Sequence, residues 1–208
     1  AYEIQFGHVT RPTHKNTSWE EAKFEVCGQK WVDVSEYGYG LALLNDSKYG
    51  YSAEGSTLAL TVLKCPDEPD PTADEGCHTF TCALLPHMGD FRAAGVIREA
   101  YALNQPLLSC PVSKNSGDLA ESFSMAKCDN PAVIIDGIKR AEKGDGLILR
   151  LYESFGGKAK AKIRVAECYT KAFLVNLMEE NPLPLPIEDG CILLDFGAFE
   201  IHTILLER

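Results

Sequence analysis

Two carboxylates and three aromatic side chains fall within one short stretch of the chain. The carboxylates are Asp33 and Glu36, and the aromatic residues are Trp31, Tyr37 and Tyr39. Aromatic rings cover the apolar face of a pyranose, while carboxylates accept hydrogen bonds from its hydroxyl groups. The stretch therefore has the composition of a polar, aromatic-rimmed loop that binds a sugar, and the surrounding residues predict that a β-hairpin carries it.

The same residues have a plainer interpretation. Aspartate and glutamate often cap turns, and aromatic rings commonly pack in a core. Nor do Asp33 and Glu36 define a glycosidase pair, because retaining hydrolysis needs two carboxylates about 5 Å apart in space, which a sequence does not show. The residues by themselves leave a sugar site and a structural hairpin both open.

A second polar cluster lies upstream, in a segment whose proline interrupts regular strand structure. It contains Arg11, His14 and Asn16. A guanidinium can bind a carboxylate through two parallel hydrogen bonds, so Arg11 could hold Asp33 or Glu36 and position the hairpin loop. The alternative is a surface turn in which Arg11 forms a local salt bridge.

Cysteine and histidine residues between positions 65 and 87 lack the spacing of a zinc site. Structural zinc ligands usually come in pairs about two to four residues apart. Here Cys65 stands twelve positions from Cys77, and Cys77 stands five from Cys82. The sequence also contains no nucleophile elbow, phosphate-binding loop, dinucleotide fingerprint or HExxH motif. We therefore predict no metal site and no catalytic residues in this chain.

Composition argues against two classes of partner. The chain has 208 residues, of which 45% are hydrophobic and 24% charged, so it can bury a substantial core. Acidic residues outnumber basic ones 30 to 20, giving a net charge of -10. Nucleic acid is not expected, because binding its backbone needs clustered Lys and Arg. A membrane partner is not expected either, because no apolar run approaches the ~20 residues that span a bilayer.

The eight cysteines are scattered singly along the chain. Several lie in strand-like apolar patterns, as Cys27 does, and none belongs to a recognisable disulfide framework. We predict eight reduced thiols that are buried like small apolar side chains.

Short alternating runs of apolar and β-branched residues predict an all-β chain of β-sandwich architecture. The expected strands cover residues 22–26, 40–44, 56–63, 146–152, 159–165 and 200–206, with turn residues between them. One short helix is predicted near 90–103, where apolar residues recur at a period near 3.6. We place a domain boundary near residue 130, which gives a larger β-sandwich portion over 1–130 and a small terminal β-sandwich over 131–208.

The chain resembles the C-terminal region of the family 38 (class II) α-mannosidases, and within them the cytosolic branch. The resemblance rests on motifs that follow one another in the family's order, at residues 1–9, 11–19, 31–51, 69–74, 78–81, 84–87, 100–107 and 149–153. Two positions depart from the pattern. Ser47 stands where a cysteine is expected, and Cys82 where a tyrosine is expected.

The resemblance implies a galactose-mutarotase-like supersandwich portion followed by a small C-terminal β-sandwich. It also implies that the chain is a non-catalytic fragment, in agreement with its start at Ala1 without a leader. The nucleophile and a divalent cation, zinc or cobalt, are expected in an N-terminal catalytic domain of the same polypeptide, so this chain should bind no cofactor. The implied activity is removal of terminal α-linked mannose from free oligosaccharides in the cytoplasm, where the sequons at Asn16 and Asn45 would stay unmodified.

Family 38 enzymes use loops of this region at the rim of the catalytic cleft, which gives the polar clusters a role. The residues expected near the substrate are Trp31, Asp33, Glu36, Tyr37, Tyr39, Arg11, His14 and Asn16. The alternative is an autonomous carbohydrate-binding β-sandwich module, in which the stretch from Trp31 to Tyr39 holds a glycan without a catalytic partner.

Overall fold

The protein is described by a computed structural model that covers residues 1–114, 116–117 and 120–208. The chain folds as two compact units, Ala1–Leu108 and Ser109–Arg208. Strands dominate both units, in agreement with the predicted all-β class. Among the described residues, no helix is both long enough and apolar enough to cross a membrane.

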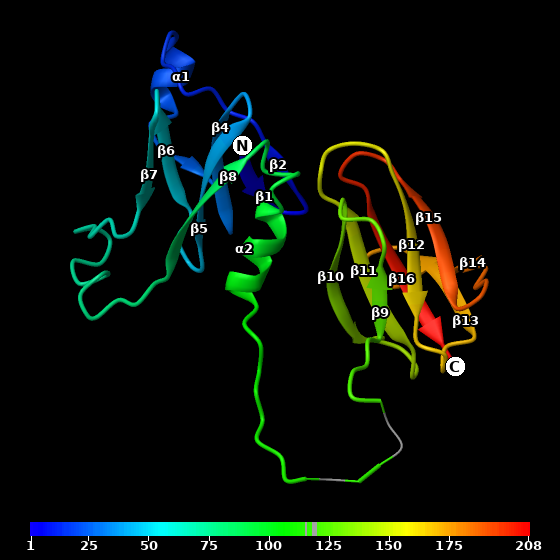
Figure 1. Cartoon of the computed structure of the whole chain (residues 1–208). Helices are drawn as coiled ribbons and strands as arrows, with labels where there is room; N and C mark the ends of the chain where they lie inside the picture. The colour runs from blue at the N-terminus through cyan, green and yellow to red at the C-terminus, as the bar shows by residue number, and fades with distance from the viewer. Residues whose placement is uncertain (115, 118–119) are drawn as a thin grey trace. The chain divides into compact units, whose positions relative to one another are not determined.

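The first unit contains two antiparallel sheets. One has five strands in the order β2-β1-β4-β5-β8, and the other has three in the order β3-β6-β7 (Figure 1). The elements are β1 (Tyr2–Ile4), β2 (Gly7–Val9), α1 (Ser18–Ala22), β3 (Val26–Cys27), β4 (Trp31–Glu36), β5 (Tyr39–Asn45), β6 (Gly50–Glu54), β7 (Thr57–Thr61), β8 (Cys82–Met88) and α2 (Val96–Asn104).

Both helices of the described chain differ from the prediction. Helix α2 begins at Val96 rather than near residue 90, because Gly95 has a left-handed backbone with φ of 72° that separates it from the preceding turns. Helix α1 replaces the start of the strand expected over 22–26. Its N-terminus has a capping box between Thr17 and Glu20, a signal that favours helix over strand even in a short segment.

A buried asparagine joins several parts of the first unit. The Nδ2 of Asn45 donates to the carbonyl of Gln29 at 3.0 Å and also to the hydroxyl of Tyr51. Its Oδ1 accepts from the backbone N–H groups of Ser47 at 3.0 Å and Lys48 at 2.5 Å. The amide nitrogen of this sequon is therefore enclosed and fully used, so a glycan cannot be attached to it in the folded chain.

The second unit is a sandwich of two antiparallel sheets, with strand orders β10-β11-β16-β13-β14 and β15-β12-β9. Strand β12 shows why they face each other: its residues alternate buried and exposed along its whole length. The elements are β9 (Ala126–Cys128), β10 (Val133–Arg140), β11 (Leu147–Glu153), β12 (Ala159–Val165), β13 (Lys171–Val175), β14 (Leu183–Leu185), β15 (Cys191–Phe196) and β16 (Ile201–Glu207).

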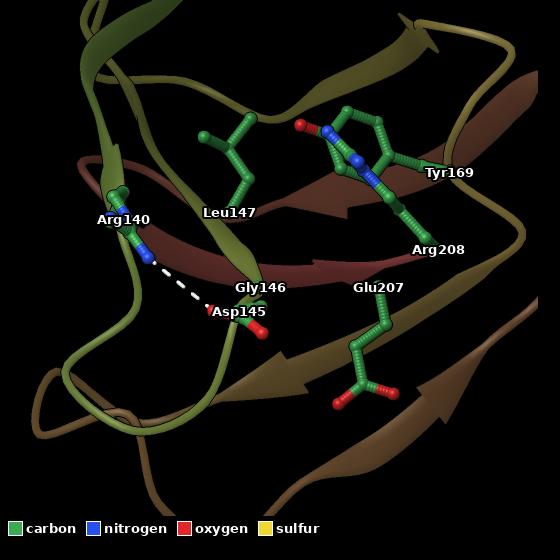
Figure 2. Close-up of a pocket in the computed structure, with 7 residues that line it drawn as sticks. All are labelled: Arg140, Asp145, Gly146, Leu147, Tyr169, Glu207 and Arg208. Atoms are coloured by element: carbon green, nitrogen blue, oxygen red, sulfur yellow. Dashed lines mark hydrogen bonds and ion pairs between the residues drawn. The ribbon is translucent and has the colours of Figure 1, made fainter.

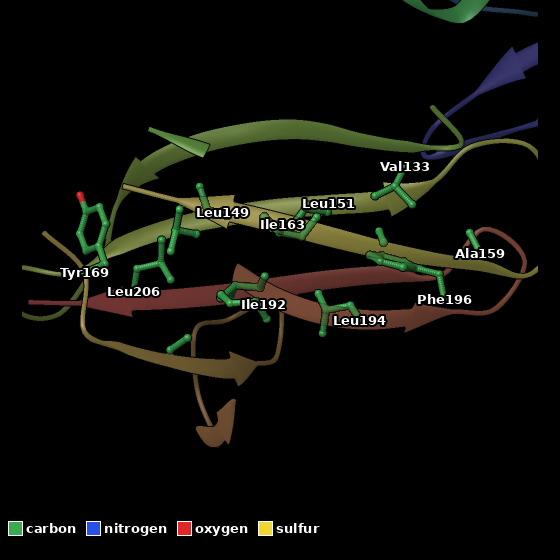
Figure 3. Close-up of a cluster of buried hydrophobic side chains, with 14 of the residues drawn as sticks. Val133, Leu149, Leu151, Ala159, Ile163, Tyr169, Ile192, Leu194, Phe196 and Leu206 are labelled. Carbon is green, nitrogen blue, oxygen red and sulfur yellow. The ribbon is translucent and has the colours of Figure 1, made fainter. Parts of the chain in front are cut away.

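The core of this sandwich lies between the two sheets (Figure 3). Leu149 and Leu151 of β11 are fully buried against Ile163 of β12 and Ile192 of β15. Burying each such side chain contributes roughly 1.5–3 kcal/mol. The predicted strands over 146–152, 159–165 and 200–206 correspond closely to β11, β12 and β16, because strong period-2 patterns specify strands well.

One buried carboxylate fixes two loops at the end of this sandwich. Glu153 is almost fully buried, and its Oε2 accepts from the backbone N–H groups of Gly156 at 2.9 Å, Gly157 at 3.1 Å and Phe199 at 3.0 Å. Its Oε1 accepts from the N–H of Phe155 at 2.8 Å. These N–H groups would otherwise lie unpaired in two turns, so Glu153 acts as a structural anchor for both.

We expect Glu153→Gln to destabilise the second unit by about 3 kcal/mol, because the charge is lost and, whichever way the amide turns, its NH₂ faces at least one N–H group and cannot accept from it. Urea unfolding followed by circular dichroism measures the loss. Tryptophan fluorescence should not change, because Trp19 and Trp31 both lie in the first unit. The exposed Glu167→Gln is the matched control, and equal stability of the two variants would contradict the anchor role.

The division into compact units falls earlier than the predicted boundary near residue 130. Strand β9 precedes that boundary, yet it pairs with β12 of the second unit, with Cys128 opposite Ile163. The segment before residue 130 thus completes the second sandwich. The assignment of 1–130 and 131–208 as the domains of the family stays a prediction.

All eight cysteines lie in described residues and are free. The expectation that they are buried is wrong for six of them, which are exposed. Cys128 is partly buried and Cys191 is buried. The difference arises because several thiols lie in loops or at strand ends, where an apolar neighbourhood in sequence does not become an apolar neighbourhood in space.

Thiol labelling of native protein prepared without reductant should therefore occur in stages. The six exposed cysteines should react quickly, the partly buried Cys128 more slowly, and Cys191 only on unfolding. Burial also raises the pKa of the Cys128 thiol, which lowers its reactive thiolate fraction. Recovery of fewer than eight thiols in denaturant would show that disulfides form.

Candidate functional site

The hairpin of β4 and β5 separates the predicted sugar-binding residues into two groups. Trp31 and Asp33 are buried within the unit, whereas Glu36, Tyr37 and Tyr39 lie at the exposed tip. Only two residues form the turn, and Tyr37 is fully exposed there. The expectation of one continuous loop is therefore wrong, because the paired strands continue almost to the tip.

Glu36 and Tyr39 line an open groove of about 840 Å³ on the face of this hairpin opposite Asp33. The groove combines hydroxyl groups and a carboxylate with an apolar floor, a mixture that suits a sugar. Ser56 of the turn between β6 and β7 and Thr57, the first residue of β7, line the same groove. The apolar lining comes from Val34, Leu41, Leu43, Leu58 and Leu84.

Asp33 lies beneath this surface and is occupied by protein partners. Its Oδ1 is 2.7 Å from Nε2 of His87, and the hydroxyl of Ser35 donates to its Oδ2. The side chains of Asp33 and His87 are 0% and 4% exposed. Asp33 thus supports the hairpin from inside, while the residues at the tip are the ones exposed to a ligand.

Gly40, which has no side chain, leaves the space in which Asp33 and His87 make contact. They lie on β4 and β8, which flank β5, and Gly40 of β5 pairs directly with His87. A Cβ atom at Gly40 would lie 2.6 Å from Nε2 of His87 and overlap the imidazole ring. Glycine is therefore required at this position by close approach rather than by backbone conformation.

We expect Gly40→Ala to displace His87 and destabilise the first unit by about 3 kcal/mol, because the buried Asp33 would lose one of its partners. Urea unfolding followed by tryptophan fluorescence measures this change. Gln5→Ala is the control, since Gln5 is exposed in a turn of the unit that holds both tryptophans. A Gly40→Ala variant as stable as the Gln5→Ala variant would show that the pair is dispensable.

His14 and Asn16 gather around Glu20 at the start of α1, away from the hairpin tip. The backbone N–H of Asn16 donates to Oε2 of Glu20 at 2.6 Å, and Nε2 of His14 lies 3.2 Å from Oε1. The Asn16 hydrogen bond is the main cause that lowers the pKa of Glu20, with smaller contributions from His14 and Thr17. The backbone of Asn16 and the side chain of His14 thus both contact Glu20, which forms the capping box with Thr17.

Arg11 does not form the carboxylate pair considered for it. Its Nη1 donates to the carbonyl of Cys27 at 2.8 Å, and its guanidinium lies 4.5 Å from the centre of the Tyr2 ring. Arg11 and Asp33 do line one small hollow of about 290 Å³, which also includes Arg92. Arg11 and Asp33 thus line the same hollow, but they do not contact each other: Arg11 donates to Cys27, and Asp33 contacts His87.

The cysteine and histidine residues near position 80 do not converge. Among residues 1–114, 116–117 and 120–208, no group of three or more His, Cys, Asp or Glu side chains is arranged to hold a metal ion. His78 contacts the carbonyl of Asp74 at 2.9 Å, and His87 contacts Asp33. The described residues thus do not fit a catalytic zinc or cobalt ion.

A separate hollow of about 690 Å³ lies in the second unit (Figure 2). Arg140 and Asp145 form an ion pair of 3.3 Å beside it, and both side chains are more than four-fifths exposed. Such a pair contributes little energy. None of the residues predicted to lie near the substrate lines this hollow, so we do not include the hollow in the candidate site.

His87 and Ser35 are the residues that sequence reasoning missed. In the sequence, His87 is noticed only as a possible zinc ligand, because its partner Asp33 is distant along the chain. A signal was present, since Gly40 lies in an otherwise bulky strand, and glycine within a strand often marks a close approach.

Two family profiles match the chain. The profile of the "Glycosyl hydrolases family 38 C-terminal domain" matches residues 1–72, and that of the "Glycosyl hydrolases family 38 C-terminal beta sandwich domain" matches residues 132–204. Together with the sandwich fold, these matches define the chain as a C-terminal β-sandwich region of a glycosyl hydrolase.

Relatives support the same conclusion. Alpha-mannosidase 2C1 of Homo sapiens is 46% identical over 211 aligned positions, which cover 99% of this chain and 20% of that protein. Alpha-mannosidase G of Dictyostelium discoideum is 49% identical over 160 positions, covering 75% of this chain and 14% of that protein. The chain thus spans about a fifth or less of these relatives' length. It belongs to glycosyl hydrolase family 38, as part of the C-terminal region.

A solved structure has the same fold. The crystal structure of an alpha-mannosidase from Enterococcus faecalis V583 superposes with a TM-score of 0.81 at 23% identity, covering 99% of this chain and 24% of that one. At this identity the likeness concerns the fold alone.

Proposed function

We propose that the whole protein is an α-mannosidase that hydrolyses terminal α-linked mannose from free oligosaccharides, and that this region is its non-catalytic C-terminal part. The family profiles and the names of the relatives support this proposal. The catalytic carboxylates, and the zinc or cobalt ion that orients the sugar, would belong to an N-terminal catalytic domain of the same polypeptide. The cytosol is the proposed compartment, and eight free cysteines are in keeping with it.

The role proposed for this region is to complete the rim of the catalytic cleft. One observation carries it: the tip of the β4–β5 hairpin presents Glu36 and Tyr39 in a groove of about 840 Å³, with Tyr37 fully exposed beside them. A solvated tyrosine has no packing role to explain it. Glu36 can accept from sugar hydroxyls, and the tyrosine rings can cover a pyranose face. Contacts at a rim would reach sugars beyond the mannose that is cleaved.

In the full-length enzyme, Glu36→Gln, Tyr37→Ala and Tyr39→Ala should each raise KM for a mannose oligosaccharide by about five- to tenfold, which corresponds to one lost contact. The melting temperature should stay nearly constant, because exposed substitutions rarely change stability. Tyr49→Ala is the control, since Tyr49 is exposed on the same unit but outside the groove. A loss of activity that merely follows unfolding would assign these residues a structural role.

The isolated chain should neither cleave nor measurably bind mannosides. Retaining hydrolysis requires a nucleophile, a general acid and, in this family, a cation, and Asp33 is already bonded to His87 and Ser35. An aryl α-mannoside with added zinc or cobalt should release aglycone no faster than buffer alone. Calorimetric titration with mannose tests the alternative, since an autonomous sugar-binding module would bind at roughly millimolar strength or better.

A further inference from the structure

We propose that His87 is a positioning residue for the rim hairpin: it holds Asp33, and through Asp33 it sets where Glu36 and Tyr37 stand. This inference rests on the proposed rim function. His87 itself is buried and does not line the groove, so it would act without touching substrate. The case depends on three features of the pair: its place in the sheet, the direction of its hydrogen bond and its closeness to the tip.

The pair ties together strands that are not neighbours. β4 and β8 are separated by β5, so the backbone ladders do not join them directly. The contact of 2.7 Å between Asp33 and His87 crosses β5 above Gly40. A second tie lies at the turn, where the N–H of Gly89 donates to the carbonyl of Gly38 at 2.8 Å. The β5–β8 ladder already runs from Asn45 opposite Cys82 to Tyr39 opposite Met88. The two ties add to this ladder: one links β4 to β8 through side chains, and the other closes the turn.

The surroundings assign the direction of the hydrogen bond. Nδ1 of His87 is buried and has no hydrogen-bond partner among the described residues. A proton there would leave a buried donor unpaired, which costs more than an unpaired lone pair on a neutral ring. We therefore assign the proton to Nε2, which donates to Oδ1 of Asp33. The other oxygen accepts from Ser35, so the carboxylate is held on both sides.

A purely apolar contact would not serve as well in this place. Packing forces are non-directional, and a hydrophobic replacement for a buried polar pair is often equally stable. A hydrogen bond instead requires one orientation of both partners. Asp33 precedes Glu36 by three positions on one strand, a span of about 10 Å. A shift of Asp33 would therefore move Glu36 and the hairpin tip as well.

Two variants in the full-length protein separate this role from simple stability. His87→Leu removes the donor and keeps an apolar side chain, whereas His87→Gln retains an N–H that can reach Asp33. Hydrogen exchange of residues 36–40 reports directly on the hairpin, and KM for a mannose oligosaccharide reports on its use. An aryl α-mannoside is the second substrate, because it has no further sugars to reach the rim. His78→Leu is the control, since His78 is exposed and lies outside the hairpin.

We expect His87→Leu to speed exchange of residues 36–40 by about tenfold and to raise KM for the oligosaccharide, with kcat on the aryl mannoside nearly unchanged. His87→Gln should restore both values. Unchanged exchange in His87→Leu, or exchange that rises across the whole first unit and is not rescued by His87→Gln, would overturn the positioning role. So would faster exchange with unchanged KM, if Glu36→Gln does raise KM. If Glu36→Gln, Tyr37→Ala and Tyr39→Ala leave KM unchanged, the rim function fails, and exchange alone decides whether His87 positions the hairpin.

Discussion

A buried hydrogen bond across a strand governs how the first unit presents its surface. Asp33 and His87 lie on opposite sides of β5 and meet only because Gly40 leaves room between them. Because Asp33 and Gly40 lie on one face of the hairpin, strand alternation places Glu36 and Tyr39 on the opposite face, which lines the groove. The pair and the groove thus occupy opposite faces of one hairpin.

Both units use a buried carboxylate to tie chain segments together in addition to the hydrogen bonds of the sheets. Asp33 joins β4 to β8 through side chains, whereas Glu153 holds two turns through their backbone N–H groups. Glu3 has a related role, since it accepts from both the backbone and the side chain of Lys30. In each case the buried carboxylate has its partners, which is the condition under which such a group is tolerated.

The proposed rim role accounts for both the groove and the family membership. A region that lends a rim to a cleft needs exposed contact groups and a firm support, and it needs no catalytic machinery of its own. The hairpin has the exposed residues Glu36, Tyr37 and Tyr39, with Asp33 and Trp31 buried behind them. The polar residues Arg11, His14 and Asn16 make contacts with nearby backbone groups and with Glu20, and their place near the substrate stays a prediction.

Sequence alone determined the all-β class, most of the second sandwich and the family. Strands such as β12 were predictable because their alternation is continuous, and a period of two has one structural solution when one face is buried. Tertiary structure alone decided the site. In the folded chain Asp33 is buried and Tyr37 is exposed. Arg11 contacts a backbone carbonyl rather than a carboxylate, and Asp33 pairs with a histidine 54 positions away. The physical reason is that burial and pairing depend on which strands become neighbours, and local spacing carries no record of a partner that lies across another strand.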